Sequence, residues 1–445
     1  MNAPHDIRQT AGADTLLRDA LVYTYPLYEM ARMRAATCPR RGPGGAFAGS
    51  DPASTLRWVN HLFHSRALLG PQHQQVVTPN NDTLYTNAWL DLSAGPVCVD
   101  VPDTGSRYYT LGLLDAYTNP FDGIGTSTTG NGKGRFLLHG PDWRGEVPAG
   151  MQAIACPTNA IWMIGRFLVD GETDAPAVHA LQDEVALTRL DGTPAAHPFD
   201  VGMDASERAA DPVRYATVVN RVLRENPPPA HEQGYVARFA EVGLGADCDP
   251  ASLTPAQTAA LGQALASLDA LLRPRAPADL GGGWSLPVEI LASFGERYED
   301  RAMVARSFIG ALGVHEAMYL IAGRDADGQL LDGNADYLLE FPAGRLPQVG
   351  AFWSLTMYRK SDCMLVENDL NRYSLGDRSP QLRYDADGGL RIQMGARTPA
   401  DPALAGNWLP APAEPFYVAL RLYLPKDAHL RKQFVYPAIR RIGGA

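Results

Sequence analysis

The sequence predicts an α+β fold, with two antiparallel, β-sandwich-like (jelly-roll-like) domains and a helical segment between them. Short runs rich in β-branched and aromatic residues, separated by Gly, Pro and Asn, fill 76–170 and recur from 336 onward. Evenly spaced short strands of this kind are typical of sandwiches or barrel-like sheets. We therefore expect N-terminal helices at 1–70, a first β-rich domain at 71–171, a mainly helical segment at 172–325 and a second β-rich domain at 326–445.

Two helices are expected before the first β-rich domain. Residues 14–34 carry apolar side chains at helical spacing, with an interruption near Pro26 because proline has no amide donor. Residues 54–66 indicate a second, short helix. His61 and His64 would share a face of it, and histidines so spaced can ligate a metal. Since no acidic residue completes a metal motif, helix-packing histidines are the preferred interpretation.

The first β-rich domain contains four clear strand patterns and one Gly-rich segment. That segment, 126–134, fails the GxxxxGK[ST] spacing and precedes a strand, so it predicts a flexible hairpin or lid and not a phosphate loop. The strands are expected at 97–101, 107–114, 135–139 and 161–169.

Helical patterns dominate the next segment. Thr254 and Gln257 flank Pro255 as a capping box, which marks a helix start. Residues 300–322 predict an amphipathic helix, and 275–285 predict a loop. His315 is expected to be a buried, hydrogen-bonded side chain, with a general base as the alternative.

The second β-rich domain is expected to begin near residue 336. Asp385 and Gly388 belong to a turn, 385–389, between two of its strands. The strands are expected at 337–341, 352–358, 390–394 and 416–424.

Composition excludes several classes of function. Hydrophobic residues make up 45% and charged residues 20% of 445 positions, as in a globular protein with ample core. The net charge is −10 and no basic stripe is present, which argues against nucleic acid as a partner. The N-terminus lacks the pattern of a signal peptide, and no apolar run approaches the roughly 20 residues of a membrane span. We expect a cytoplasmic protein without a membrane partner.

The cysteine spacing and the absence of cofactor motifs exclude further kinds of site. The five cysteines are scattered without a CxxC pair, which fits neither a zinc site nor a disulfide framework. Cys98 and Cys156 lie among apolar neighbours and are expected in the core. Neither a GxSxG elbow nor a GxGxxG followed by a helix is present, so no Rossmann-bound cofactor is expected.

Two polar clusters in the first β-rich domain are candidate sites. Asn80, Asn81 and Asp82 follow Pro79, with Tyr85 just beyond them. These groups either face a cleft or form an Asx turn before a strand. The second cluster follows a strand end, where sites are often placed on rigid scaffolds. It comprises Asp115, Tyr117 and Asn119.

The second β-rich domain contributes two arginines and a tryptophan. Arg372 and Arg378 lie within seven positions, and arginine forks suit carboxylate or phosphate ligands. Internal bridges to Asp369 or Asp377 are the alternative. Trp408 is either a core residue or a ligand platform.

At these motifs the chain resembles a two-part family, with domain of unknown function 1254 in the N-terminal region and domain of unknown function 1214 in the C-terminal region. The resemblance rests on TPNNDTLYTNAWLDLS, VPDTGSRYYTLGLLDAYTNPFDGIG, TTGNGKGRFLLHGPDW and CPTNAIWMIGRFLVDG in the first half. In the second half it rests on LLDGNADYLLEFPAGRLPQVGAFWSLTMY, LNRYSLGDRS and NWLPAPAEPFYVALRLYLPK.

The resemblance implies a cytoplasmic or exported bacterial-type protein with two β-sandwich-like domains, helices between and around them, and no assigned activity. One local departure is the stretch 359–363, where relatives tend to carry a short acidic-glycine turn. If that hairpin borders the pocket, the ligand of this chain differs from that of its relatives.

From the residues, we expect a cofactor-independent enzyme that acts on a small polar or carboxylate-bearing molecule by hydrolysis, elimination or isomerisation. The site would lie between the two β domains. Asp82 or Asp115 would be the general base and Tyr85 or Tyr117 the proton donor. Arg372 and Arg378 would clamp an anion. The side chains that orient the substrate would be Asn80, Asn81 and Asn119.

A non-catalytic small-molecule or carbohydrate-binding protein is the alternative function. Trp89, Trp353 and Trp408 would then form the platform, and unperturbed, exposed carboxylates would favour this alternative. No cofactor is predicted, although six converging oxygens would make a calcium-type site. Exposed sheet edges would also allow a homodimer.

Overall fold

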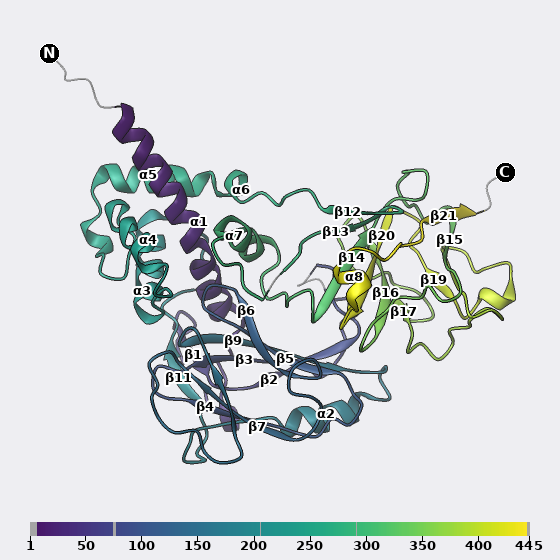
Figure 1. The fold of residues 1–445 in the computed structure, drawn as a ribbon, viewed down its shortest axis with the longest axis horizontal. Coiled ribbons are helices and arrows are strands. Elements are labelled where there is room, and N and C mark those ends of the chain that lie inside the picture. The colour runs from purple at the N-terminus through teal and green to yellow at the C-terminus, as the bar shows by residue number, and fades with distance from the viewer. Residues whose placement is uncertain (1–6, 74–76, 205, 291, 443–445) are drawn as a thin grey trace.

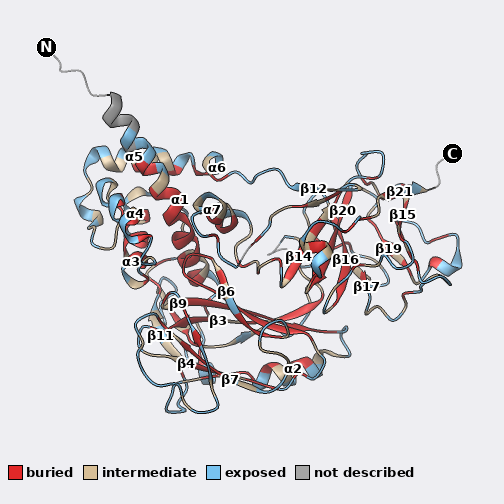
Figure 2. Ribbon diagram, in the orientation of Figure 1, coloured by how far each residue is buried: buried red, intermediate tan, exposed pale blue. Residues whose placement is uncertain are grey.

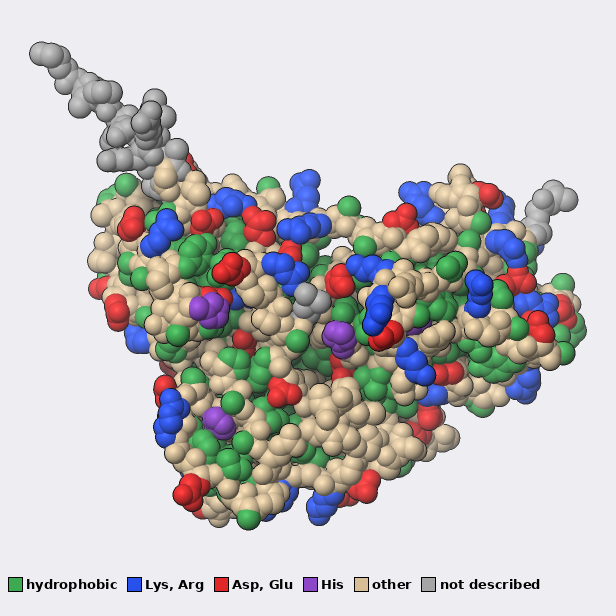
Figure 3. All heavy atoms as spheres, in the orientation of Figure 1, with side chains coloured by type: hydrophobic (Ala, Val, Ile, Leu, Met, Phe, Trp, Pro, Cys, Tyr) green, Lys and Arg blue, Asp and Glu red, His purple; other side chains and the backbone are tan. Residues whose placement is uncertain are grey.

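The computed structural model describes residues 7–73, 77–204, 206–290 and 292–442, and it confirms the predicted α+β fold. Figure 1 shows a helical cluster at the upper left, a first β domain below it and a second β domain to the right. Buried residues concentrate on the strands of both β domains and on much of α1 (Figure 2). On the face in Figure 3, acidic and basic side chains are interspersed.

The first β domain consists of two sheets that face each other across a shared core. Val99 of one sheet and Leu111 and Met163 of the other lie fully buried in this core. Pairing is antiparallel except at the edge, where β7 and β8 run parallel. In strand order, the sheets are β2 (Phe63–His64), β3 (Thr83–Asp91), β9 (Ala160–Leu168), β5 (Tyr109–Leu114), β6 (Pro120–Gly125); and β10 (Ala186–Thr188), β4 (Val97–Val101), β7 (Gly134–His139), β8 (Gln152–Ala155).

The second β domain repeats this arrangement with a larger sheet. Leu355 and Leu420 from the larger sheet and Ile392 from the smaller one share a core. β18 and β19 form the parallel exception. In strand order, the sheets are β12 (Ala278–Gly281), β13 (Trp284–Leu286), β14 (Ala317–Ala322), β20 (Phe416–Tyr423), β16 (Trp353–Arg359), β17 (Ser374–Gly376); and β19 (Trp408–Pro410), β18 (Leu390–Gly395), β15 (Asp336–Phe341), β21 (Ile439–Ile442).

The helices gather around α1 and build a separate core from residues such as Leu21, Tyr215 and Leu265. A two-stranded sheet of β1 (Leu56–Val59) and β11 (His197–Asp200) adjoins the first β domain. None of the helices within the described ranges combines the length and apolar character needed to cross a membrane. The helices are α1 (Ile7–Thr37), α2 (Ala175–Glu184), α3 (Pro212–Glu225), α4 (Gln233–Ala237), α5 (Pro255–Ala266), α6 (Leu268–Leu271), α7 (Tyr298–Ser307) and α8 (Asp427–Leu430), with 3₁₀ turns η1 (Pro43–Gly45), η2 (Arg238–Val242), η3 (Pro250–Ser252) and η4 (Pro402–Leu404).

Several local predictions are confirmed. The capping box is present, because the Thr254 hydroxyl accepts from the Gln257 amide and the Gln257 side chain accepts from the Thr254 amide. Cys98 and Cys156 are buried, and all five cysteines are free thiols. The predicted strands of both β-rich blocks form within one or two residues of their expected ends.

Four predictions of secondary structure are wrong, each because long-range packing overrides the local pattern, and His315, expected to be buried, is exposed. α1 continues through Pro26, which is buried against the helical core. The expected helix at 54–66 forms β1 and β2, since β1 pairs with the distant β11. Only the first part of the expected helix at 300–322 is helical, because α7 ends at Ser307 and the strand β14 begins at Ala317. The expected loop at 275–285 contains β12 and most of β13.

Candidate ligand pocket between the two β domains

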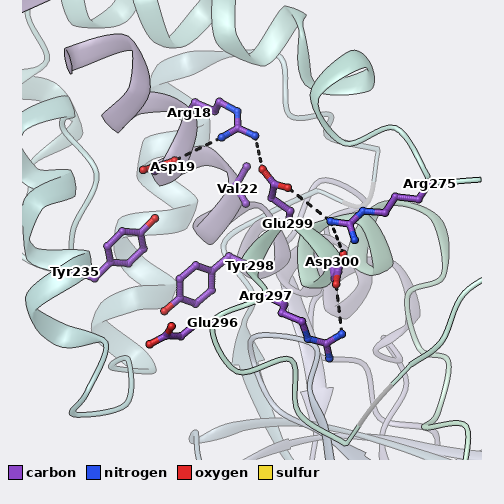
Figure 4. A pocket seen from close by; sticks show the side chains of 10 residues that line it. All are labelled: Arg18, Asp19, Val22, Tyr235, Arg275, Glu296, Arg297, Tyr298, Glu299 and Asp300. Carbon is purple, nitrogen blue, oxygen red and sulfur yellow. Dashed lines mark hydrogen bonds and ion pairs between the residues drawn. The ribbon is translucent and has the colours of Figure 1, made fainter. Parts of the chain in front are cut away.

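A cavity of about 360 Å³ opens beside the N-terminal half of α1 (Figure 4). Its three arginines are already paired with carboxylates of the same cavity, and Glu296 is the one carboxylate drawn in Figure 4 without a partner. Arg275 contacts Asp300 at 3.1 Å, Arg297 contacts the same carboxylate at 3.4 Å, and Arg18 pairs with Glu299. A cleft whose arginines are all paired offers little to an anionic ligand, so it is not the favoured site.

The larger cavity, about 910 Å³, lies between the two β domains. This volume is within the range typical of small-molecule sites, roughly 300 to 1,000 Å³. Strands β3 and β9 of the first domain form one wall, and β14 and β20 of the second domain form another. Two further segments contribute, 307–311 at the end of α7 and residues 77, 78 and 80 before β3. The rest of the lining comes from Phe63, Ser65, Leu69, Pro287, Gly323 and Lys360.

Strand alternation decides which side chains reach this cavity. On β9, Trp162, Ile164 and Arg166 line it, while the intervening Met163 and the adjacent Phe167 lie in the core of the first domain. This follows from the two-residue period of a β-strand, which sends successive side chains to opposite faces. The side chain of Arg166 therefore projects into the cavity, on the same face of β9 as Trp162 and Ile164.

The second domain supplies the opposite wall by the same rule. Tyr319 on β14 and Arg421 on β20 both line the cavity, and they are direct cross-strand partners. Leu320 and Leu420, next to them in sequence, lie in the core of that domain. Arg166 likewise lies opposite Tyr85 of β3. Each wall therefore presents an arginine beside a tyrosine.

The Arg166 guanidinium is buried, with 5% of the residue exposed, and it has no hydrogen bond or ion pair within the described part of the chain. It lies 5.5 Å from the centre of the Tyr85 ring, and Tyr319 lines the same cavity. A buried charge normally has a partner, because burial alone is costly. Arg166 is thus a cation held in place without a protein anion.

Arg421 is buried too, but its donors are used. It donates to the Thr356 hydroxyl at 2.9 Å and to the Thr78 carbonyl at 3.1 Å. Its charge also interacts with Asp82, which lies behind the cavity wall. Arg421 therefore ties the two domains together, and Arg166 remains the unpaired cation.

Neutral donors and apolar groups form most of the remaining lining. Burial raises the pKa of Tyr319, which keeps its phenol protonated near neutral pH. Aspartate and glutamate are absent from the described lining, and Lys360 adds one further cation at an exposed position. Lys360 belongs to the stretch 359–363, so that hairpin does border the pocket. The described residues contain no group of three or more His, Cys, Asp or Glu side chains that could hold a metal ion.

The segment 78–82, here called the clasp, joins the first domain to the second. Thr78 bonds Tyr417 at 2.7 Å, the Pro79 carbonyl accepts from Tyr358 at 2.7 Å, and Asn80 donates to Tyr423 at 3.0 Å. Asp82 accepts from Ser354 at 2.6 Å and pairs with Arg378 at 3.2 Å. Most polar groups of the clasp are thus used to connect the domains.

Among the residues predicted from this first cluster, Asn80 and Tyr85 line the cavity. Asp82 does not belong to the lining, and its carboxylate is bonded by Ser354 and Arg378. Asn81 also lies outside the lining and donates to the Leu69 carbonyl at 2.8 Å.

The second predicted cluster lies under the helices, away from this cavity. Asp115 accepts from the amides of Tyr117 and Asn119, both at 2.9 Å, and from the Asn119 side chain. Burial raises the pKa of Asp115. The Tyr117 hydroxyl donates to the Asn226 carbonyl, and Tyr117 belongs to the helical core. The structure therefore does not bring Asp82 and Asp115 together around the cavity.

The predicted residues of the second domain are also engaged elsewhere. Arg372 donates to the carbonyls of Ala405 and Trp408, and the Trp408 indole donates to Gly395. Arg378 pairs with Asp82 and Asp170. None of the three lines the cavity.

Sequence reasoning missed Arg166, Arg421 and Tyr319, which dominate the polar part of the cavity. A signal was present, since each arginine interrupts an otherwise apolar strand, AIWMIGRFL or FYVALRLY. An arginine in the middle of a buried strand is rare without a partner. Both arginines therefore stand out in the sequence as candidates for a site.

The fold and the site geometry define an α+β protein with a pocket between two β domains. Residues 59–189 match the family described as "Protein of unknown function (DUF1254)", and 316–427 match "Protein of unknown function (DUF1214)". The chain belongs to this two-part family. A search of curated proteins gives no match.

One solved structure shares the fold across almost the whole chain. The VPA0106 protein from Vibrio parahaemolyticus aligns with a TM-score of 0.73 and 27% identity, over 97% of this chain and all of that one (100%). An uncharacterized protein from Burkholderia cenocepacia aligns with a TM-score of 0.40 and 14% identity, over 99% of this chain and 91% of that chain, and supports no argument.

Proposed function

We propose that this protein binds a small anionic molecule with a mainly apolar body in the cavity between its two β domains. The main support for this proposal is the guanidinium of Arg166. It is a buried cation in the cavity wall without a hydrogen bond or ion pair to any described residue. An anionic ligand would supply the missing partner, and apolar side chains around it would exclude water and strengthen the attraction.

Binding is proposed in preference to acid-base turnover because of how the carboxylates are placed. Asp82 and Asp115 are each held by other side chains or amides outside the described cavity lining. A general base needs hydrogen-bond reach to its substrate, directly or through one water. The lining instead offers donors, which hold an anion without removing a proton from it.

The proposal is tested with 8-anilinonaphthalene-1-sulfonate, an apolar anion whose fluorescence rises on binding. We expect saturable binding at one site per chain. Arg166→Gln should weaken binding by about tenfold or more, because a hydrogen bond to a charged group contributes about 1.5–3 kcal/mol. The protein should stay folded, since Arg166 holds no partner whose loss would cost stability.

Arg189→Gln is the matched control, because it removes an equal charge from an exposed position in the same part of the chain. It should leave the affinity unchanged. Equal binding by wild type and both variants would overturn the proposal.

A further inference from the structure

The ligand's head group can be specified from the charges around Arg166. Arg378 forms ion pairs with both Asp82 and Asp170. The charge of Asp82 also acts on Arg421. The positive charges of these two arginines are therefore balanced by the two carboxylates. Arg166 is thus left as the one buried positive charge of the lining without a match among the described residues, since Lys360, the other unmatched cation of the lining, is exposed. A single unmatched charge in a buried site fits a monoanion better than a dianion, whose second charge would be buried unpaired.

A nearby carboxylate reinforces this restriction. Glu316 accepts from the Tyr108 hydroxyl at 2.5 Å and also from Ser127. Tyr108 is one of the tyrosines that surround Arg166. Glu316 also interacts electrostatically with Tyr319. A second negative charge on the ligand would therefore meet repulsion from Glu316.

Hydrogen-bond donors around Arg166 match the two oxygens of a carboxylate. Tyr85 from the first domain, whose ring centre lies 5.5 Å from the guanidinium, and Tyr319 from the second both line the cavity, and neither hydroxyl has a hydrogen-bond partner among the described residues. A carboxylate has acceptor sites for about four donors. One guanidinium and two phenols, contributed from both sides, would satisfy most of them.

The rest of the cavity is apolar and extends beyond the main chamber. Its apolar wall includes Phe63, Ile164 and Ile309. A pouch of about 60 Å³ adjoins it, and Phe308 and Ala311 line both spaces. A hydrocarbon tail would bury its surface along this wall, which is the main favourable contribution for apolar ligands.

Resting on the proposed function, we infer that the ligand is a monocarboxylic acid with a hydrocarbon tail. Its carboxylate lies between Tyr85 and Tyr319 at Arg166, and its tail extends past Ile309 toward the pouch. Both domains contribute to the head-group site, so neither domain alone forms it.

Calorimetric titration with octanoate, octyl phosphate and 1-octanol tests the head group on the intact chain. Octanoate should bind at least about tenfold more tightly than either comparison compound, given the cost of an unpaired buried charge or an unfilled donor. Arg166→Gln should weaken octanoate about tenfold or more. Tyr319→Phe and Tyr85→Phe should each weaken it severalfold, and Arg189→Gln should have no effect.

A chain-length series tests the tail. From hexanoate to decanoate, affinity should rise about threefold to fourfold per methylene, the factor expected for burying one such group. Ala311→Phe, which narrows the passage to the pouch, should remove most of this gain for decanoate and leave hexanoate unchanged. A flat series would overturn the tail assignment.

The outcomes separate this inference from the proposed function. If octyl phosphate binds as tightly as octanoate and requires Arg166, the monocarboxylate assignment is wrong and anion binding stands. The same holds if octanoate fails to bind while the sulfonate dye binds through Arg166. If neither dye nor octanoate depends on Arg166, both are wrong.

Discussion

At the scale of single residues, burial sets the chemistry of polar groups more strongly than residue type does. Arg166 and Arg421 are both buried strand residues, yet among the described residues only the guanidinium of Arg421 has hydrogen-bond partners. His429 shows the same principle for a titratable ring. It is fully buried, its Nε2 accepts from the Gln348 amide at 2.9 Å, and its Nδ1 therefore carries the proton that is donated to Tyr436 at 2.6 Å. Protonating Nε2 would break the first bond.

His429 should make stability depend on pH. Burial lowers its pKa from 6.5 to about 4 in the folded protein. Between these values the unfolded chain binds more protons than the folded protein. The contribution of His429 to the free energy of unfolding is therefore complete above pH 6.5 and is lost as the pH drops toward 4. From pH 7 to pH 5 this one group should cost about 2 kcal/mol. Urea unfolding at a series of pH values measures the slope.

His429→Gln should show a shallower decline than wild type over that range. His64, whose pKa burial also lowers to about 4, would account for part of the remaining slope. The control is His231→Gln, whose exposed ring should leave the slope unchanged. Parallel profiles for wild type and His429→Gln would exclude this role for His429.

At the scale of elements, each cavity strand has two faces with different tasks. One face packs in its own domain core, and the other presents Tyr, Arg and apolar groups to the cavity. Helix boundaries depend on more local contacts. α5 begins with the reciprocal bonds of Thr254 and Gln257, which satisfy two amides at a helix start that would otherwise be free.

Removing this cap should weaken the start of α5. We expect Thr254→Ala to lower the free energy of unfolding by about 1 kcal/mol, the usual cost of losing an N-cap side chain. Thermal and urea unfolding measure the change. Thr217→Ala, in the middle of α3, removes a hydroxyl that only bonds back to the Val213 carbonyl and should be near neutral. Equal effects of the two substitutions would contradict the capping role.

At the scale of the whole molecule, the clasp is one of the contacts that hold the two β domains together around the cavity, beside an apolar cluster that joins Tyr108 to Phe352 and Tyr423. Asp82 of the first domain is buried and meets Ser354 and Arg378 of the second. The same clasp contributes Asn80 to the cavity lining and supplies the Thr78 carbonyl that orients Arg421. Domain association and cavity shape therefore depend on the same few contacts.

Loss of the Asp82 carboxylate should loosen this association. We expect Asp82→Asn to lower the free energy of unfolding by about 3 kcal/mol, because Arg378 loses its buried partner. Calorimetry should also show the two β domains unfolding less cooperatively.

Asp170→Asn is the matched control, since Asp170 contacts the same arginine from a side chain that is 53% exposed. An exposed pair of this kind contributes at most about 1 kcal/mol. A loss for Asp82→Asn no larger than for Asp170→Asn would show that the clasp does not stabilise the domain interface.

The sequence by itself determined the fold class, most strands, the capping box and the family, because these depend on local periodicity, turn residues and specific motifs. It also located the 78–85 segment as a special one. It could not tell that Asp82 faces Ser354 while Tyr85 faces a cavity, since that depends on the register of two sheets brought together by the chain's folding. Strand pairing between distant segments likewise decided 54–66 and the strand at 317–322. Only the tertiary structure placed Arg166 and Tyr319 from separate domains around one space, because their proximity is a property of two packed surfaces and of no single stretch of chain.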